Sequence, residues 1–325
     1  MKYYIGIDLG GTNIAAGVVN ENKEIVAKTS IKTGSGRPVD LIADDMASAA
    51  KQAAEIAGLT LEDVEWVGIG APGTANKASG IIEYSNNLGW HGVPLVKMLE
   101  ERTGKKVYIE NDANAAAYGE YVAGAAKDAD ISVMVTLGTG VGGGVVIHNK
   151  IYTGFNFAGA ELGHSVIVVD GRTCTCERKG CLEAYASATG LITTTKEYME
   201  KYKDSIMWEL VKHDLSKVSG RTAFDAMRKG DAAGKQVVDS YIKYLACGIT
   251  NIINTFQPDI LCIGGGISHE GDTLMVPLKE IVKREVYSRN SARNTEIAAP
   301  SQENNTCILL LGSHGDVASL RLVRP

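Results

Sequence analysis

One local pattern occurs twice in this chain, and it limits the folds that the chain can adopt. Residues 3–19, YYIGIDLGGTNIAAGVV, read as a β-strand, a glycine turn and a second β-strand. The pattern returns at residues 131–152 as ISVMVTLGTGVGGGVVIHNKIY. We interpret the repetition as a trace of duplication. It predicts an α/β fold of two related halves that face each other.

Helical and strand patterns alternate between and after these two segments. Apolar residues recur at helical spacing from Pro38 to Ala57, and Gly58 ends the run. A strand (VEWVGIGAPG), a helix from about Pro94 and a strand (KKVYIE) follow, before Asp112 opens the alanine-rich helix DANAAAYGEYVAGAA. A long amphipathic helix is expected at 231–256, then a buried strand in DILCIGGGIS. Because no linker rich in proline or serine interrupts the chain, we expect two closely packed domains around a cleft.

Length and charge exclude several classes of protein. A chain of 325 residues is long for one hydrophobic core, so two domains are expected. The net charge is −5 without a basic run, which does not suggest a nucleic-acid or acidic-membrane partner. Asp8 interrupts the start where a signal peptide needs an apolar core, and no stretch is long and apolar enough to span a bilayer. We therefore expect a cytoplasmic protein with reduced thiols.

The second glycine turn matches a nucleotide-binding motif only by spacing. Gly138, Gly140 and Gly143 fit G-x-G-x-x-G, but that dinucleotide fingerprint needs a helix after it, and GGVVIHNKIY is strand-like. Taken alone, each turn is more often a glycine-rich hairpin without a ligand than a binding site. Two such turns favour phosphate binding, because glycine lets backbone N–H groups converge on an anion. Thr12 and Thr139 can add hydroxyl donors.

Other phosphate-binding motifs do not fit the chain. It carries neither the Walker A lysine motif nor the protein-kinase signatures. Asp8, beside the first turn, can hold a hydrated Mg²⁺ ion, which usually keeps several waters and one or two carboxylates. An enzyme that uses ATP would therefore belong to another class of phosphate binder.

Three cysteines and one histidine gather within eighteen residues. They follow the spacing H-x9-C-x-C-x4-C, and three thiolates with one imidazole make a closed tetrahedral zinc site of the structural kind. A disulfide would leave one of the three cysteines unpaired, and a reducing compartment disfavours it. The ligands would be His164, Cys174, Cys176 and Cys181. The remaining cysteines lie in apolar runs and are expected in the core: Cys247, Cys262 and Cys307.

Four segments occur in an order that resembles one protein family. They are DLGGTN (8–13), ENDANAAA (110–117), LGTGVGGG (137–144) and the cysteine segment. Together they resemble the ROK family of sugar kinases and sugar-responsive repressors, over residues 5–312, and NNLGW at 86–90 is most similar to the family's bacterial glucokinases. The resemblance implies two actin/hexokinase-like (ribonuclease H-like) domains around a cleft. It places a small domain at 1–115, joined by a C-terminal helix at 313–325, and a larger one at 116–312.

The resemblance also implies a reaction and a set of site residues. The reaction is the phosphorylation of a hexose by ATP with Mg²⁺, with glucose converted to glucose 6-phosphate and Asp112 as general base. Zinc would occupy the four positions named above, and His164 would use its other ring nitrogen for the sugar. The sugar would meet Gly73, Asn87, Asn111, Asp112, Glu161, His164 and Glu183. The nucleotide and its Mg²⁺ would meet Asp8, Gly10, Gly11, Thr12, Asn13, Gly138, Thr139, Gly140, Gly264, Gly265 and Gly266.

The sequence departs from the family pattern at two places and leaves alternatives open. Glu177 replaces a glycine that usually follows the CxC pair, and LGSHGDVASL near the C-terminus differs from the family's more acidic form. The alternative among enzymes, ranked after a glucose kinase, is a kinase for fructose, mannose or N-acetylmannosamine. A sugar-sensing repressor is less favoured, because a strand expected from Tyr3 leaves no room for a helix-turn-helix. A binding-only sensor is less favoured because the turns and Asp112 are intact. The resemblance implies a homodimer or homotetramer.

Overall fold

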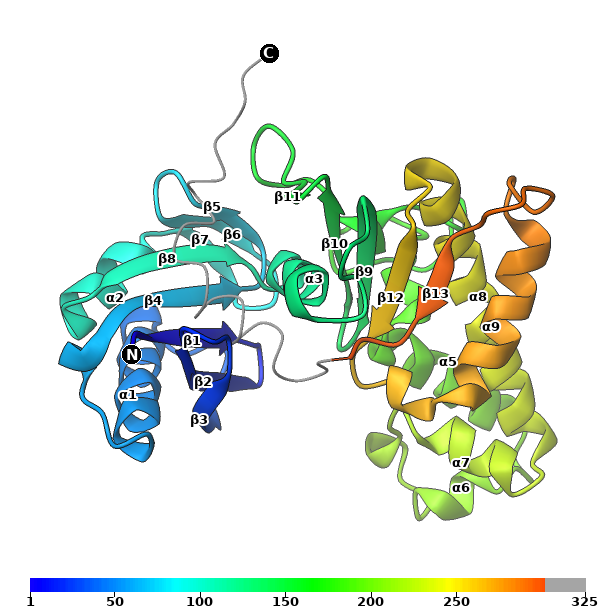
Figure 1. Cartoon of the computed structure of the whole chain (residues 1–325). Helices are drawn as coiled ribbons and strands as arrows, with labels where there is room; N and C mark the ends of the chain where they lie inside the picture. Colours follow the sequence, from blue (N-terminus) through cyan, green and yellow to red (C-terminus); the bar gives the residue numbers. More distant parts are fainter. Residues whose placement is uncertain (302–325) are drawn as a thin grey trace. The chain divides into compact units, whose positions relative to one another are not determined.

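The computed structural model describes residues 1–301, which form a mixed α/β structure (Figure 1). The chain divides into two compact units. Unit 1 holds residues 1–128 and 144–160 with Ser301, and unit 2 holds residues 129–143 and 161–300. The domain boundaries expected from the sequence remain a prediction. The helix expected at 313–325, the LGSHGD segment and Cys307 lie outside the described residues.

Unit 1 is built on a five-stranded sheet with the order β3-β2-β1-β4-β8. The first three strands form an antiparallel meander, whereas β4 and β8 run parallel to β1. The glycine-containing hairpin expected at the start of the chain is therefore confirmed. The strands are β1 (Tyr3–Leu9), β2 (Asn13–Asn20), β3 (Ile25–Lys32), β4 (Val64–Ala71) and β8 (Lys106–Asn111).

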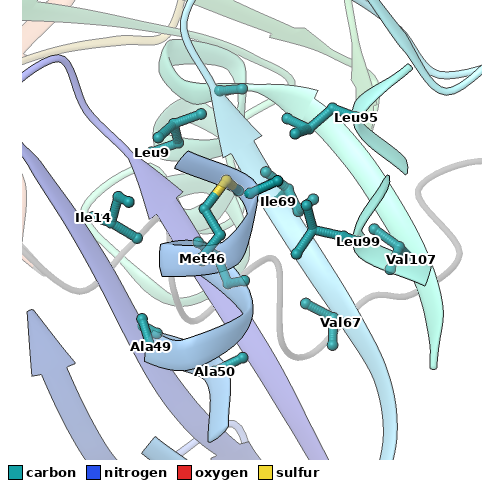
Figure 2. Packing of buried hydrophobic residues seen from close by; sticks show 14 of the residues in the cluster. Leu9, Ile14, Met46, Ala49, Ala50, Val67, Ile69, Leu95, Leu99 and Val107 are labelled. Carbon is teal, nitrogen blue, oxygen red and sulfur yellow. The ribbon is translucent and has the colours of Figure 1, made fainter. Parts of the chain in front are cut away.

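Two helices pack against this sheet and close its core. Helix α1 (Val39–Ile56) confirms the expected helix, and Gly58 takes a positive φ of 73° just after it, as a C-terminal stop requires. Helix α2 (Leu95–Thr103) ends in the same way at Gly104. Figure 2 shows the apolar side chains between helices and strands, with Met46 of α1 among those of β1 and β4. This burial is the main stabilising term for the unit.

Further elements of unit 1 lie at the end of the sheet where β8 finishes, whereas the short η1 precedes β4. A small antiparallel sheet has the order β5-β6-β7, and β5 contacts β8. Helix α3 follows β8 directly and contacts both β4 and β8. The elements are η1 (Leu61–Asp63), β5 (Thr74–Asn76), β6 (Ile81–Ser85), β7 (Trp90–Val93) and α3 (Asp112–Ala123).

The second sheet repeats the strand order of the first. Its order is β11-β10-β9-β12-β13. In both sheets the first three strands in the sequence are neighbours, and two later strands are added beside the first strand. Strand β12 runs parallel to β9 and β13. The two related halves expected from the repeated sequence pattern are thus confirmed. The strands are β9 (Ile131–Leu137), β10 (Val141–Ile147), β11 (Lys150–Ile151), β12 (Ile260–Gly264) and β13 (Glu296–Ala298).

Helices supply most of unit 2. Helix α8 (Ala232–Phe256) is the long amphipathic helix expected at 231–256, and the Asp231 side chain caps it by accepting from the Gly234 N–H. Within the described part of the chain, no helix is both long and apolar enough to cross a membrane. The others are η2 (Leu162–His164), α4 (Glu183–Ala186), α5 (Ala188–Lys201), α6 (Met207–Leu210), η3 (Leu215–Lys217), α7 (Thr222–Arg228), η4 (Ser268–Glu270) and α9 (Asp272–Glu285).

Candidate functional site

The first glycine turn (residues 10–12) links β1 to β2 and follows Asp8 by two residues. The Gly10 N–H donates to the Asn13 carbonyl at 2.9 Å and closes the turn. Thr33, which is fully buried, fixes the turn through two hydrogen bonds. Its N–H donates to the Thr12 carbonyl at 3.0 Å and its hydroxyl donates to the Gly10 carbonyl at 2.6 Å. Two carbonyls of the turn are therefore fixed by one residue that the sequence reasoning did not single out.

Asn111 and Asp112 lie where β8 passes into α3. The Asn111 side chain, rather than that of Asp112, caps the helix: its oxygen accepts from the Asn114 N–H at 3.0 Å. The Asn111 amide nitrogen donates to the Gly73 carbonyl at 3.0 Å, so the structure brings these two predicted sugar residues together. Asp112 is the first residue of α3, where the helix dipole favours a negative charge. Asn87 is exposed in the turn between β6 and β7.

The second glycine turn (residues 138–140) links β9 to β10. Strand β10 follows this turn, whereas the dinucleotide fingerprint requires a helix there. The structure therefore excludes that motif, as the sequence predicted. The Gly138 N–H donates to the Gly140 carbonyl at 3.0 Å. The start of α5 holds the turn: the Ala188 N–H donates to the Gly138 carbonyl, and the Thr189 hydroxyl donates to the Thr139 carbonyl, both at 2.8 Å.

The glycine run at 264–266 lies beside the start of the second turn. Gly265 has a φ of 88°, and a Cβ there would overlap the backbone of Leu137. The Ile267 N–H donates to the Leu137 carbonyl at 3.3 Å. Two of the segments predicted to bind the nucleotide, residues 138–140 and 264–266, are therefore neighbours within unit 2.

The four predicted metal ligands converge. One ligand atom from each of His164, Cys174, Cys176 and Cys181 lies within 4.8 Å of the other three. The sulfurs of Cys176 and Cys181 are 3.7 Å apart, and Nδ1 of His164 is 3.6 Å from the Cys174 sulfur. In a tetrahedron with Zn–S bonds of about 2.3 Å and a Zn–N bond of about 2.0 Å, two sulfurs are about 3.8 Å apart and a sulfur and the nitrogen are about 3.5 Å apart. The donor set and its spacing therefore fit zinc.

Backbone contacts shape the loop that carries the cysteines. Gly180 has a φ of 81°, and a Cβ there would overlap the Val168 carbonyl, so only glycine fits. The Cys174 N–H donates to the Arg178 carbonyl at 2.8 Å, which closes a tight turn. Within that turn Glu177 has a φ of 67°, the left-handed conformation that a glycine adopts without strain.

Burial sets the protonation of the cluster in the absence of a cation. It raises the pKa of the Cys181 thiol to about 12, and the neighbouring sulfurs of Cys176 and Cys174 add to the shift. Burial also raises the pKa of the Cys174 thiol, and the nearby Glu183 carboxylate contributes to that rise. A bound cation reverses this preference because the thiolate is the metal ligand. Metal binding therefore releases protons and weakens as the pH falls.

Glu183 joins the cysteine loop to the second glycine turn. One carboxylate oxygen accepts from the Val141 N–H at 3.0 Å, and the other accepts from the Thr175 hydroxyl at 2.8 Å. A Cβ at Gly140 would overlap the same carboxylate, so the glycine there leaves room for Glu183. The φ of Gly140 is not positive, so its backbone conformation does not require glycine. The residue is glycine because a side chain would overlap Glu183. Glu161 is exposed one turn before His164, whose N–H donates to its carbonyl at 3.1 Å.

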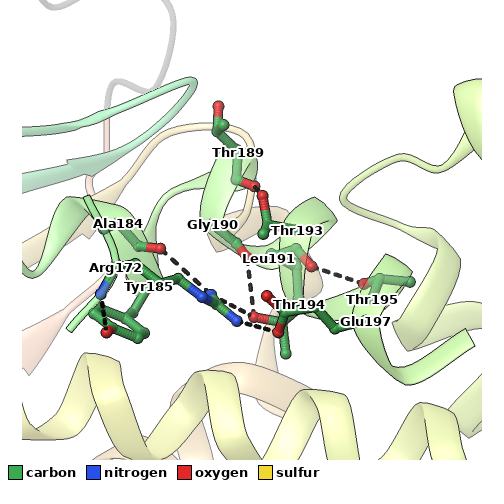
Figure 3. Close-up of polar contacts among 10 residues, drawn as sticks. All are labelled: Arg172, Ala184, Tyr185, Thr189, Gly190, Leu191, Thr193, Thr194, Thr195 and Glu197. Atoms are coloured by element: carbon green, nitrogen blue, oxygen red, sulfur yellow. Dashed lines mark hydrogen bonds and ion pairs between the residues drawn. The ribbon is translucent and has the colours of Figure 1, made fainter. Parts of the chain in front are cut away.

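Arg172 fastens the base of the cysteine loop to α5 (Figure 3). Its guanidinium donates to the Thr194 hydroxyl at 2.9 Å and pairs with Glu197. Its backbone N–H donates to the Tyr185 hydroxyl at 2.7 Å, and the guanidinium lies 5.0 Å from the centre of that ring. Because α5 also holds the second glycine turn, helix, loop and turn form one connected structure.

The structure thus assembles the predicted site residues in two sets, one in each unit. Unit 1 carries Asp8, the first glycine turn, Gly73, Asn87, Asn111 and Asp112. Unit 2 carries the second glycine turn, Glu161, His164, Glu183, the three cysteines and residues 264–266. The sequence reasoning missed Thr33, Thr175 and Arg172. No local motif marks them, because their contacts depend on chain segments that only the fold brings together.

Comparison with known proteins places this site in a family. A model of the ROK family matches residues 4–311 of the chain. The chain belongs to the ROK family. The family resemblance and the fold class expected from the sequence are therefore confirmed, and the converging histidine and cysteines are consistent with the family's zinc site.

The chain is similar to proteins with different activities. A glucokinase from Thermotoga maritima is 40% identical over 86% of this chain and 86% of its own length. A xylose repressor from Bacillus subtilis is 32% identical over 69% of this chain and 54% of its own length. The crystal structure of a Streptomyces griseus ROK glucokinase in complex with glucose and AMPPNP is 32% identical, with a TM-score of 0.85. The structural match covers 95% of this chain and 97% of the S. griseus chain.

Proposed function

We propose that this protein transfers the terminal phosphoryl group of ATP to a hexose, with glucose preferred, and releases glucose 6-phosphate and ADP. The likeness to the S. griseus glucokinase, whose crystals hold glucose and AMPPNP, carries the proposal, since it extends over 95% of the chain. The 40% identity to the T. maritima glucokinase supports glucose among the hexoses.

Phosphoryl transfer depends mainly on positioning and on charge, and it needs a group that accepts the hydroxyl proton. In the proposal Asp112 accepts that proton while the sugar oxygen bonds to the terminal phosphorus. The bond from that phosphorus to the bridging oxygen breaks, and ADP leaves. The place of Asp112 at the first residue of α3 supports this assignment, and the Ala113 N–H, which donates to its Oδ1 at 2.8 Å, orients the carboxylate.

The remaining roles follow from the two sets of residues. Asp8 would hold the Mg²⁺ ion that ATP carries, and the two glycine turns with residues 264–266 would receive the nucleotide. The sugar would contact Gly73, Asn87, Asn111, Glu161, His164 and Glu183 as well as Asp112. The position of His164 Nδ1 beside a cysteine sulfur leaves Nε2 for a sugar hydroxyl. We also propose a homodimer or homotetramer, which light scattering can test.

Zinc would be held by His164 and the three cysteines and would have a structural role. Four protein ligands complete a tetrahedron and leave no position for water or substrate. Its contribution would be rigidity in the loop from which Glu161, His164 and Glu183 extend.

An assay of ADP release with ATP and a panel of hexoses tests the proposal. We expect glucose to give the highest kcat/KM among glucose, fructose, mannose and N-acetylmannosamine. Asp112→Asn should lower kcat by about 10²–10⁴-fold while calorimetry still detects glucose binding. A higher kcat/KM for another hexose would reject only the preference for glucose. The absence of turnover with every sugar would reject the kinase.

A further inference from the structure

A lysine and a glutamate form an ion pair in the interior of unit 1. Nζ of Lys77, in the turn between β5 and β6, lies 3.1 Å from Oε2 of Glu110 in β8. The Glu110 side chain is 3% exposed and that of Lys77 is 23% exposed. Lysine and glutamate are rarely buried unless paired, because charge loses hydration in the interior. The pair therefore needs a reason beyond surface solvation.

The other oxygen of Glu110 holds the start of α3. Oε1 accepts from the Asn111 N–H at 3.0 Å and from the Asn114 side-chain amide at 3.1 Å. Glu110 therefore makes three hydrogen bonds, with Lys77 on one oxygen and two groups around the helix start on the other. The backbone immediately before Asp112 is fixed by this carboxylate.

Asn111 is held on its side chain as well as on its backbone. Its amide nitrogen donates to the Gly73 carbonyl, and its oxygen accepts from the Asn114 N–H. Only glycine fits at position 73, because its φ is 101° and a Cβ there would overlap the Tyr84 carbonyl. The direction in which Asp112 leaves the helix start thus depends on a connected set of contacts centred on Glu110.

Charge explains why Glu110 needs a partner. In the sheet Asp8 pairs with Gly70, and Gly70 pairs with Glu110, so Asp8 and Glu110 share one row two strands apart. With strands about 4.8 Å apart, their Cα atoms are separated by roughly 10 Å. Asp112 is two residues from Glu110. Three carboxylates therefore occupy one end of the sheet, and Lys77 neutralises the buried one.

We infer that Glu110, with Lys77 as its counter-ion, is a positioning residue for the proton-accepting Asp112 and for Asn111. This inference rests on the proposed kinase function. In this inference Glu110 acts through the backbone N–H of Asn111 and the side-chain amide of Asn114 rather than through a contact with the substrate. Its loss changes the geometry of the reacting groups rather than their identity.

Variants of Lys77 separate positioning from stability. Lys77→Met keeps the length of the side chain but leaves Glu110 without its cation. We expect kcat to fall by up to about 10²-fold, a loss that a 1 Å misplacement of reacting groups can cause, and the KM for glucose to rise. The KM for ATP should stay within about twofold, since Glu110 orients the helix start and not the glycine turns. Lys77→Arg, which retains the charge, should restore most of kcat.

A control and a readout independent of activity complete the experiment. Arg102→Met removes the cation that pairs with Asp40 and Asp44 in the same unit, away from the helix start. It should lower the melting temperature without changing either KM. In Lys77→Met the amides of Asn111 and Asn114 should exchange with solvent faster than in the wild type, whereas Arg102→Met should leave their exchange unchanged.

The outcomes decide between the two proposals. Wild-type kcat, glucose KM and amide exchange in folded Lys77→Met would overturn the positioning role. An equal loss of kcat in Arg102→Met would overturn it too, since general destabilisation would then explain the effect. If the wild type phosphorylates no hexose, the kinase proposal fails, and amide exchange alone still supports or rejects the positioning of Asn111 by Glu110.

Discussion

The two glycine turns have the same place in their sheets but different surroundings. Each links the first two strands of a five-stranded sheet, and each is closed by a hydrogen bond from its first glycine. Among the side-chain contacts described for the first turn, the one that fixes it is the hydrogen bond from the Thr33 hydroxyl to the Gly10 carbonyl. The second turn is held by the start of α5 and by Glu183, which also contacts the cysteine loop. A change in the loop should therefore reach the second turn and spare the first.

Among the changes that should affect the second turn and spare the first, loss of the metal should have the largest effect on activity. Cys176→Ser removes one thiolate ligand, so zinc content should fall and the loop bearing Glu183 should loosen. We expect kcat to drop by at least about 100-fold with glucose, and the KM for ATP to rise because Glu183 no longer holds the Val141 N–H. Elemental analysis and steady-state kinetics on the same sample measure both effects.

Cys247→Ser is the matched control, because Cys247 lies in α8 and is not part of the cluster. It should keep its zinc and its activity. Full activity in a zinc-free Cys176→Ser preparation would show that the loop holds Glu183 without metal. An unchanged KM for ATP with lost glucose affinity would show that the loop and the second turn are independent.

The next largest difference between the two turns is expected when a glycine in each is replaced by alanine. At Gly140 a Cβ would overlap the Glu183 carboxylate, so Gly140→Ala should displace Glu183. We expect the KM for glucose to rise about tenfold, with a fall in kcat, because the carboxylate is shared with the cysteine loop. At Gly11 there is open space, and Gly11→Ala should leave the KM for glucose unchanged.

Gly11→Ala also tests the first turn as a phosphate site. If phosphates approach that turn closely, its KM for ATP should rise even though the free enzyme accommodates the methyl group. Equal values of the KM for glucose in Gly140→Ala and the wild type would mean that Glu183 shifts without consequence, and that its link to the turn is not functional.

Removing the hydroxyl that holds each turn should have a smaller effect, on stability. Thr33→Val leaves the Gly10 carbonyl without its buried donor, and we expect a loss of about 1 kcal/mol in the free energy of unfolding. Thr189 is exposed, and water can replace its hydroxyl, so Thr189→Val should cost less than about 0.5 kcal/mol. Urea unfolding measures both. Equal losses would mean that the two turns are held with similar strength.

Much of the fold could be predicted from the sequence because its signals are local. Helical periodicity and a following glycine located α1 within one or two residues. The repeated strand–turn–strand segments indicated two related sheets, and the strand orders agree. The metal cluster was predictable for the same reason, since its four ligands lie within eighteen residues and the chemistry of the donors is distinctive.

The contacts that organise the site could not be predicted, because they join distant segments. Glu183 reaches the second glycine turn 42 residues away, and Lys77 reaches Glu110 across 33 residues. Periodicity and motif spacing carry no information about such pairs, which depend on how loops are placed by the sheets. At α3 the sequence located Asp112 at the helix start but did not indicate that the side chain of Asn111 caps the helix.

The smallest expected effect concerns strain in the loop that holds the second turn. Glu177 has a φ of 67° and is exposed, so its side chain contributes little that would offset the strain. Left-handed backbone costs a non-glycine residue about 1–2 kcal/mol. Glycine removes that strain but adds about 0.4–1 kcal/mol of conformational entropy to the unfolded chain. Glu177→Gly should therefore stabilise the protein by about 0.5–1 kcal/mol.

Gly180→Ala supplies the opposite case in the same loop. Its φ of 81° and the overlap of a Cβ with the Val168 carbonyl should make it destabilising and reduce zinc content. Urea unfolding of both variants with zinc present measures the two changes. Since Glu177→Gly relaxes the turn without moving a ligand, its KM for ATP and for glucose should equal those of the wild type. A destabilised Glu177→Gly would mean that contacts of the glutamate side chain outweigh the backbone strain, and that the second turn is attached to an unstrained loop.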